Sequence, residues 1–116
     1  MDNSILSSVK KALGIMDAYN YYDLDIIMHI NSVFSILTQL GVGPKNGFTI
    51  HDANDLWTDY LPNSVKLDMV KTYMYMKVRL IFDPPSSSAG ISATETCIKE
   101  LEWRLNVAVD PGEEEV

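Results

Sequence analysis

The sequence predicts a one-domain, all-α protein, and three observations lead to this fold class. Apolar residues recur at intervals of three and four along most of the chain, which is the spacing of one helix face. No segment alternates apolar and polar residues for long enough to predict a strand. The 116 residues are 47% hydrophobic and 22% charged, which suits a soluble domain with a single core. We therefore expect a small bundle of three long helices and one or two short ones.

The N-terminal half predicts one short helix and the first long one. Residues 4–13 place apolar side chains on one face, which indicates a short helix. Residues 23–40 carry a longer apolar stripe, formed by Ile26, Ile30, Val33, Leu37 and Leu40. Asp23 and Asp25 favour the N-terminus of this helix electrostatically. Residues 41–44, Gly-Val-Gly-Pro, then end it.

The middle of the chain predicts a turn, a brief helix and a second long helix. Residues 45–51 read as a turn or a short extended piece, and Asp52 is expected to cap a brief helix over residues 52–61. The second long helix is expected to begin at residue 63 or 64 and to end at residue 82. Two neighbouring stripes run along it: Leu67, Val70, Met74, Val78 and Ile81 form the first, and Tyr73, Met76 and Leu80 form the second. A helix with so much apolar circumference lies centrally in a core or has a second partner.

A sharp break and a last helix follow. Pro84 and Pro85 cannot continue the helix, and proline also restricts the residue before it. Residues 86–90, with the sequence SSSAG, are expected to form a pliable connection. The stripe of the last helix is Ile91, Thr94, Ile98, Leu101 and Leu105, and the helix should end near Asn106. We expect residues 1–107 to form the helical domain and residues 108–116 to form a flexible acidic tail.

Charge and hydropathy exclude several classes of protein. The formal net charge is −7, and the nine basic residues are scattered, so a conventional nucleic-acid-binding surface is not expected. No apolar run approaches the roughly 20 residues that cross a bilayer. The N-terminus has no basic region leading into an apolar core, so we expect neither membrane association nor a secretory signal. The single cysteine, Cys97, fits a reducing compartment and is expected to be a small buried residue of the last helix.

Candidate catalytic and metal-binding residues are few. Asp25 and His29 are four residues apart and can share a helix face, but no third ligand lies in register with them. His51 and Asp52 resemble the dyad of metal-dependent phosphohydrolases, yet the other ligands of that site are missing. Cys97 has no histidine placed by sequence to activate it. We therefore expect no enzymatic activity, no metal and no cofactor.

The sequence offers better candidates for protein–protein contacts. Trp103 and Arg104 lie off the apolar stripe of the last helix, so at least one of them should face outward. Both residue types are enriched at interface hot spots, although a second-layer core position for Trp103 is the alternative. The break at Phe82–Pro85 is either a contact region or an ordinary interhelix loop. The candidate contact residues are Phe82, Asp83, Pro84, Pro85, Trp103 and Arg104.

Five segments in order carry a family resemblance. They are SILSSVKKALGI, DLDIIMHINSVFSILTQLGVG, DLWTDYL, VKTYMYMKVRLIFDPPSSS and ELEWRLNV. Over roughly residues 4–107 this set resembles the head–tail connector (adaptor) proteins of long-tailed bacteriophages. The pieces RLIFDPP and ELEWRLN are the most specific.

The resemblance implies a small, all-α, non-enzymatic protein of the virion. Such connectors form a ring, usually of about twelve copies, beneath the portal vertex of the DNA-filled head. The ring extends the DNA channel and contacts the portal protein and a downstream head-completion or tail protein. Packaged DNA would pass without specific binding, which suits an acidic chain. The expected location is the head–tail junction, reached after assembly in the host cytoplasm.

Two hypotheses and one alternative complete these expectations. Residues 84–90 would lie at a subunit or portal contact and become ordered on assembly, and residues 108–116 would dock on the portal. A closed ring needs two different faces on each subunit, and the twice-striped helix is expected to supply one apolar face beyond the core. The alternative is an acidic helical regulatory module that mimics DNA or sequesters a partner, which would give a small defined complex.

Overall fold

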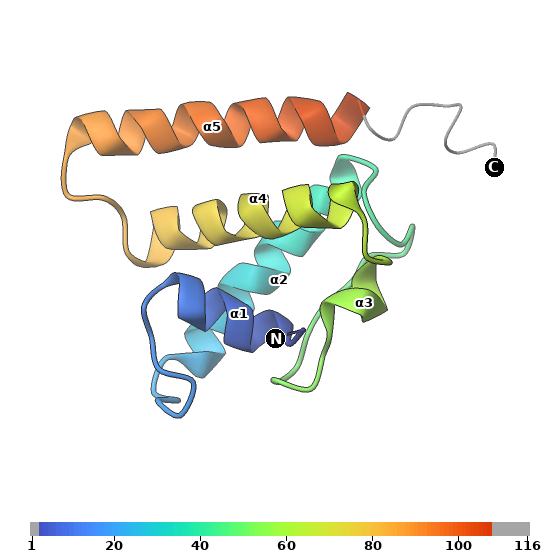
Figure 1. Cartoon of the computed structure of the whole chain (residues 1–116), viewed down its shortest axis with the longest axis horizontal. Coiled ribbons are helices and arrows are strands. Elements are labelled where there is room, and N and C mark those ends of the chain that lie inside the picture. Colours follow the sequence, from blue (N-terminus) through green and yellow to red (C-terminus); the bar gives the residue numbers. More distant parts are fainter. Residues whose placement is uncertain (1–2, 108–116) are drawn as a thin grey trace.

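Helix α4 (Val65–Phe82) is the central element of the structure, a computed structural model that describes residues 3–107 (Figure 1). It packs against α1 (Ile5–Ala12), α2 (Asp23–Gln39) and α5 (Ser88–Val107), and a single turn, α3 (Trp57–Tyr60), precedes it. Residues 3–107 contain no strand, only an isolated bridge between Ser4 and Leu56. The expected all-α bundle of three long helices with one or two short ones is confirmed, and residues 3–107 contain two short ones.

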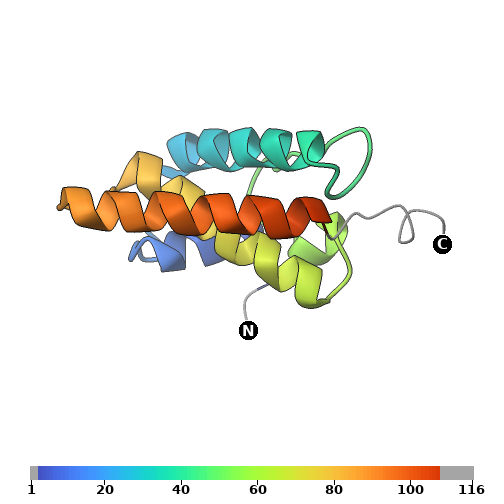
Figure 2. The ribbon, with the colours of Figure 1, turned by 90° about the horizontal axis from the view of Figure 1, so that it is seen from above.

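The helices lie in layers around α4. Helix α5 runs along one side of α4 as an outer layer, whereas α2 crosses α4 on another side and α1 lies below (Figures 1 and 2). The segment between α1 and α2 and the C-terminal end of α5 lie toward opposite ends of the molecule's long axis (Figure 1). The tail predicted for residues 108–116 lies outside the described residues.

The core forms where the stripes of α2 and α4 meet. The fully buried side chains of these helices are Ile26, Ile30, Val33, Phe34 and Leu37 from α2 and Leu67, Val70, Tyr73, Met74 and Val78 from α4. Burying a side chain of this size contributes about 1.5–3 kcal/mol to stability. Ile81 does not join them: it is 56% exposed, because it lies in the last turn of α4, at the edge of the core.

The second stripe of α4 is covered by α5 of the same chain. The Tyr73 hydroxyl donates a hydrogen bond to Glu102 Oε2 on α5 at 2.7 Å, and Met76 and Leu80 are partly buried against the core. The expectation that this stripe leaves a free apolar face on α4 is therefore wrong. The second partner that the pattern requires is the last helix itself.

The ends of α2 and α4 follow the sequence signals. Ser64 Oγ accepts the Leu67 N–H at 3.1 Å and caps α4. After α2, Gly41 adopts φ +86°, and the Val42 N–H returns to the Leu37 carbonyl at 2.9 Å. Only glycine takes this left-handed conformation at low cost, which is why the helix ends here.

The brief helix is shorter than expected, and Asp52 does not cap it. Only Trp57–Tyr60 is helical, and the Asp59 carboxylate accepts the Leu56 N–H at its start, at 3.1 Å. Asp52 Oδ1 instead accepts the Asn54 N–H at 2.8 Å in a tight turn. Aspartate bonds its own backbone two residues on as readily as it caps a helix, and the turn forms here.

The pliable connection predicted over residues 86–90 ends three residues earlier than expected. Ser88, Ala89 and Gly90 already belong to α5, so the connection consists of residues 83–87. Ser87 explains the early start, because its Oγ accepts the Gly90 N–H at 3.0 Å and its carbonyl accepts the Ile91 N–H at 3.0 Å. A serine in this arrangement satisfies a free donor of the first helical turn.

Candidate interaction surface

A group of exposed apolar side chains lies in the segment before α2 and on the first turns of α2. Its members, here called the tyrosine surface, are Met16, Tyr19, Tyr21, Tyr22, Leu24 and Met28. Their exposed fractions lie between 37% and 77%. Isolated exposed apolar residues are ordinary, but six within 13 positions mark a contact surface.

Ring contacts hold the three tyrosines together. The Tyr21 and Tyr22 rings meet edge to face with their centroids 4.8 Å apart, and the Tyr19 ring lies 6.1 Å from Tyr22. Tyr22 also meets the ring of Phe82, at 5.2 Å, at the end of α4. Edge-to-face pairs at these separations are favourable. The tyrosines therefore form one aromatic cluster anchored on the bundle by Phe82.

Lys10 fixes the segment that carries the tyrosines. Its side chain is buried, and Nζ donates to the Asp17 carbonyl at 2.8 Å and lies 2.9 Å from Asp23 Oδ1. That carboxylate oxygen is buried and accepts no hydrogen bond within the described part of the chain, so the charge of Lys10 compensates its burial. Ser7 Oγ donates to Asp17 Oδ1 at 2.7 Å. These contacts close the α1–α2 connection and leave its aromatic side chains facing outward.

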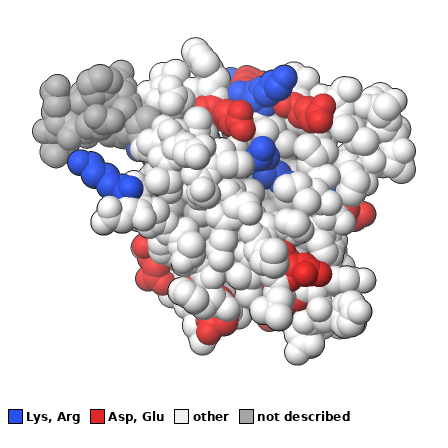
Figure 3. Space-filling view, turned by 180° about the vertical axis from the view of Figure 1, so that it is seen from behind, with Lys and Arg blue, Asp and Glu red and all other residues white. Residues whose placement is uncertain are grey.

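The outer face of α2 changes character along its length. Leu24 and Met28 lie one turn apart on this face, and Ser32 and Ser35 follow them toward the C-terminus, all exposed. The side of the molecule that α2 crosses carries few charged side chains in its middle (Figure 3). The apolar part of the face is therefore confined to the end where the tyrosines gather.

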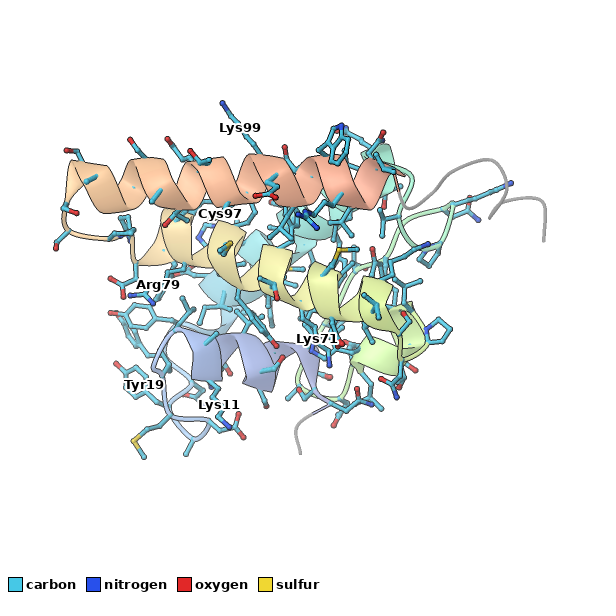
Figure 4. All side chains as sticks on the ribbon, turned by 45° about the horizontal axis from the view of Figure 1, so that its top comes forward. Lys11, Tyr19, Lys71, Arg79, Cys97 and Lys99 are labelled. Atoms are coloured by element: carbon cyan, nitrogen blue, oxygen red, sulfur yellow. The ribbon has the colours of Figure 1, made fainter. Side chains whose placement is uncertain are left out.

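Two basic side chains lie at the same end of the molecule. Lys11, at the end of α1, and Arg79, near the end of α4, are exposed and lie at the end that holds Tyr19 (Figure 4). Neither forms an ion pair with another described residue. Asp17 and Asp25 are exposed in the part of the chain that forms the tyrosine surface, so its surroundings carry charges of both signs.

A second exposed apolar area lies at the C-terminal end of α5. Trp103 is 67% exposed, and Val107, one turn further, is also exposed. Arg104 is held by Glu100, with its Nη2 2.8 Å from the Glu100 carboxylate. Asn106 Nδ2 donates to the Leu40 carbonyl at 3.3 Å, which ties this end of α5 to the end of α2. Trp103 and Val107 are here called the α5 surface.

The structure separates the contact residues that the sequence singled out into two groups. Phe82 is half-buried under Tyr22, whereas Asp83 and Pro84 are exposed, and Pro85 packs against Gly90. This group lies before the start of α5, and the outward-facing Trp103 and Arg104 lie near its end. The fifteen residue steps of helix from Ser88 to Trp103 correspond to about 22 Å, so the two groups do not form one site.

Sequence reasoning missed the tyrosine surface, although a signal was present. The segment AYNYYD places three tyrosines in four positions directly before the first acidic residue of α2. Helical periodicity does not apply to the segment between two helices. It therefore could not indicate that these tyrosine rings face outward. Large aromatic residues gathered in a connection are the signal that would have indicated a contact surface.

The candidate catalytic and metal-binding residues lie apart from one another within residues 3–107. No group of three or more metal-ligating side chains occurs among residues 3–107. His51 is exposed beside Asp55, at 4.0 Å, and His29 is half-buried on α2. Cys97 was expected to be buried, but it is exposed. The reason is its position one residue before Ile98, which turns its side chain about 100° from the face that packs on α4.

The groove beside α2 is lined by uncharged side chains, and two tyrosines of the core are held protonated by their surroundings. A groove of about 390 Å³ between α2 and residues 46–49 is lined by uncharged side chains, among them Asn31, Thr38 and Phe48. Burial raises the pKa of Tyr60 and of Tyr73, and the hydrogen bond and negative charge of Glu102 raise the pKa of Tyr73 further. Both phenols therefore stay protonated, which is the opposite of what a general base or nucleophile requires.

Comparisons with known proteins agree with a contact role. Within residues 3–107, no helix combines the length and the apolarity needed to span a membrane. A family model described as phage connector protein matches residues 5–112. No curated protein and no solved structure matches the chain.

Proposed function

The chain belongs to the phage connector protein family, and from this premise we propose that it forms a closed ring beneath the portal and joins the DNA-filled head to the tail. Family membership makes it a structural, non-enzymatic protein of the phage particle that contacts other virion proteins. The proposal adds a ring of about twelve copies. The portal protein would bind one side, and a head-completion or tail protein would bind the other.

One observation carries the proposal: a single copy leaves two apolar surfaces exposed at separate places. The tyrosine surface lies at the start of α2, and the α5 surface lies beside its end. A ring requires a heterologous contact, in which one face of a subunit meets a different face of its neighbour. Two separate surfaces on one subunit meet that requirement.

The charge of the chain supports a channel through which DNA moves. The formal net charge is −7. An acidic wall makes no counterion-releasing contacts with phosphate, so packaged DNA can slide without being held. A basic wall would bind DNA tightly and hinder its passage.

The connection at residues 83–87 and the start of α5 are proposed to lie at a subunit or portal contact and to become more ordered on assembly. The support is local: Asp83 and Pro84 are exposed at the edge of the bundle. Hydrogen exchange tests this at the residues that have an amide. Slower exchange over residues 83–90 in the assembled ring than in the free protein is expected, and equal exchange rates contradict the idea.

The ring is tested by electron microscopy and analytical ultracentrifugation of the purified protein, alone and mixed with its portal. Uniform rings on the portal are the expected result. A small complex of fixed stoichiometry with a partner other than the portal would instead indicate the sequestering module. Deleting residues 108–116 tests the proposed role of the tail: portal binding should be lost while helicity is kept.

A further inference from the structure

We propose that neighbouring copies join through the two surfaces described above: the tyrosine surface of one copy binds the α5 surface of the next, with Trp103 at the centre of the contact. This inference rests on the proposed ring and names the side chains that close it. The occupant of the tyrosine surface is therefore a second copy of this chain.

The exposed area fits a subunit contact. At about 200 Å² for a fully exposed large side chain, the six members of the tyrosine surface expose roughly 700–800 Å². A stable protein–protein interface of standard size buries about 800 Å² on each partner. The tyrosine surface alone is thus close to one side of such an interface.

The α5 surface has the anatomy of the opposite side. Interfaces commonly hold a central Trp or Tyr anchor surrounded by a polar rim that excludes water. Trp103 is 67% exposed, and its helix neighbours Lys99, Glu100 and Asn106 are exposed and polar or charged. A tryptophan ring also packs favourably among tyrosine rings in edge-to-face geometry.

The tyrosine surface and the α5 surface of one copy lie too far apart to contact each other. The tyrosine surface lies at the N-terminus of α2, and Asn106 of α5 is bound to Leu40, which follows the C-terminus of the same helix. The 17 residues of α2 span about 25 Å, so a single molecule cannot bring its two surfaces together. A neighbouring copy can, and the same contact then repeats around a ring.

Site-specific cross-linking tests the contact. All variants carry Cys97→Ser, which removes the only cysteine of the sequence. Lys99→Cys lies one turn from Trp103, and Leu24→Cys lies in the tyrosine surface. Ser35→Cys is the matched control, because it lies on the same face of α2 three turns away, at a distance of about 16 Å. One variant of each mixture carries an affinity tag, so that mixed and identical pairs are distinguished after reaction with a short bis-maleimide.

The expected result is at least a fivefold excess of mixed product for Leu24→Cys with Lys99→Cys over Ser35→Cys with Lys99→Cys, measured in portal-bound protein. Equal yields for the two mixtures would overturn the proposed contact. So would a dominant product of Leu24→Cys with itself, because that product indicates a symmetric contact.

Two alanine variants distinguish a failure of the proposed contact from a failure of the proposed ring. Trp103→Ala should abolish ring formation without changing helicity or the urea midpoint, whereas Val65→Ala, at an apolar side chain that is 77% exposed and lies outside both surfaces, should still form rings. If the wild-type protein forms rings and both cross-linking and Trp103→Ala show no effect, the contact is wrong and the proposed function stands. If the wild-type protein neither oligomerises nor binds the portal, the proposed function fails, and the contact fails with it.

Discussion

The ring of Tyr22 meets the ring of Phe82 edge to face, with the centroids 5.2 Å apart, and so joins the start of α2 to the end of α4. Phe82 is the last residue of α4, where the helix stops before two prolines. The break in the chain thus has a structural use in a single copy: it leaves a half-buried aromatic ring in place to support the tyrosine cluster. Phe82 supports the cluster from below, whereas the exposed tyrosines themselves form the contact surface.

Phe82→Ala should lower the free energy of unfolding by about 2 kcal/mol, because it removes a half-buried ring and its edge-to-face contact. Urea unfolding followed by circular dichroism measures the change. Leu24→Ala is the control: this side chain is 77% exposed, and leucine and alanine have similar helix propensities. Its effect should stay within about 0.5 kcal/mol. Equal effects of the two substitutions would contradict the role assigned to Phe82.

Lys10→Met should destabilise the fold by about 3 kcal/mol. The substitution leaves a buried oxygen of Asp23 without its compensating charge and the Asp17 carbonyl without its donor. Lys11→Met, at the exposed neighbouring position, is the matched control and should change the free energy of unfolding by less than about 0.5 kcal/mol. Urea denaturation in low and high salt measures both. The Lys10 effect should persist in high salt, because buried pairs are weakly screened.

Gly43→Ala should cost clearly more than Gly14→Ala, although both glycines have a left-handed backbone with φ of +87° and +79°. A Cβ at Gly43 would lie 2.5 Å from the Tyr60 ring, whereas a Cβ at Gly14 would meet no atom within 4 Å. The Tyr60 ring is buried and cannot move aside easily. We expect about 1 kcal/mol for Gly14→Ala from backbone strain alone, and at least about 3 kcal/mol for Gly43→Ala. Similar thermal midpoints for the two variants would refute this reading of the contact.

Asp55 should make stability depend on pH in the acid range. The hydrogen bond from the His51 N–H, at 2.6 Å, is the main reason that the pKa of the Asp55 carboxyl lies below its usual value; burial acts in the opposite direction, and the Asp52 N–H and the charge of His51 lower the pKa further. A depressed folded-state pKa gives stability that is present above the usual carboxyl pKa of about 4 and is lost as the pH falls through the folded-state pKa.

The comparison with Asp55→Asn isolates this effect, because asparagine keeps an acceptor oxygen but does not titrate. Urea unfolding from pH 7 to pH 2 should show wild type more stable than Asp55→Asn by a constant amount above about pH 5. The difference should then shrink below about pH 4. A difference that stays constant down to pH 2 would show that the charge of Asp55 has no part in it.

The spacing of apolar residues predicted the long helices well, because the side chains at that spacing are the ones that pack in the core. The stripe from Ile26 to Leu37 and the stripe from Leu67 to Val78 are both buried, as the spacing indicated. The cap at Ser64 was also within reach of sequence reasoning, because serine there has one helical donor to satisfy. The place of Trp103 and Arg104 off the stripe predicted that at least one of them faces outward, and both do; that Trp103 is not a second-layer core residue came from the structure.

The errors arose where side chains compete for the same backbone groups or where no period exists. Ser87 could end a pliable loop or cap a helix, and only the structure shows that it caps α5. Asp52 could cap α3 or make a turn, and it makes the turn. The tyrosines before α2 lie outside any helix, so their direction depends on the contacts of Lys10, which sequence alone does not reveal.

Helix α5 buries few of its side chains fully, and this affects the dynamics of the protein. This 20-residue helix fully buries only Ile98 and Leu105, whereas α2 fully buries five side chains in 17 residues. Elements with little buried surface open with a smaller free energy than the whole domain. Amide protons of α5 should therefore exchange through a partial opening in which the remaining helices stay folded. Each such opening exposes Tyr73, Met76 and Leu80 on α4. An apolar strip that α5 covers in the closed state is therefore transiently accessible to solvent.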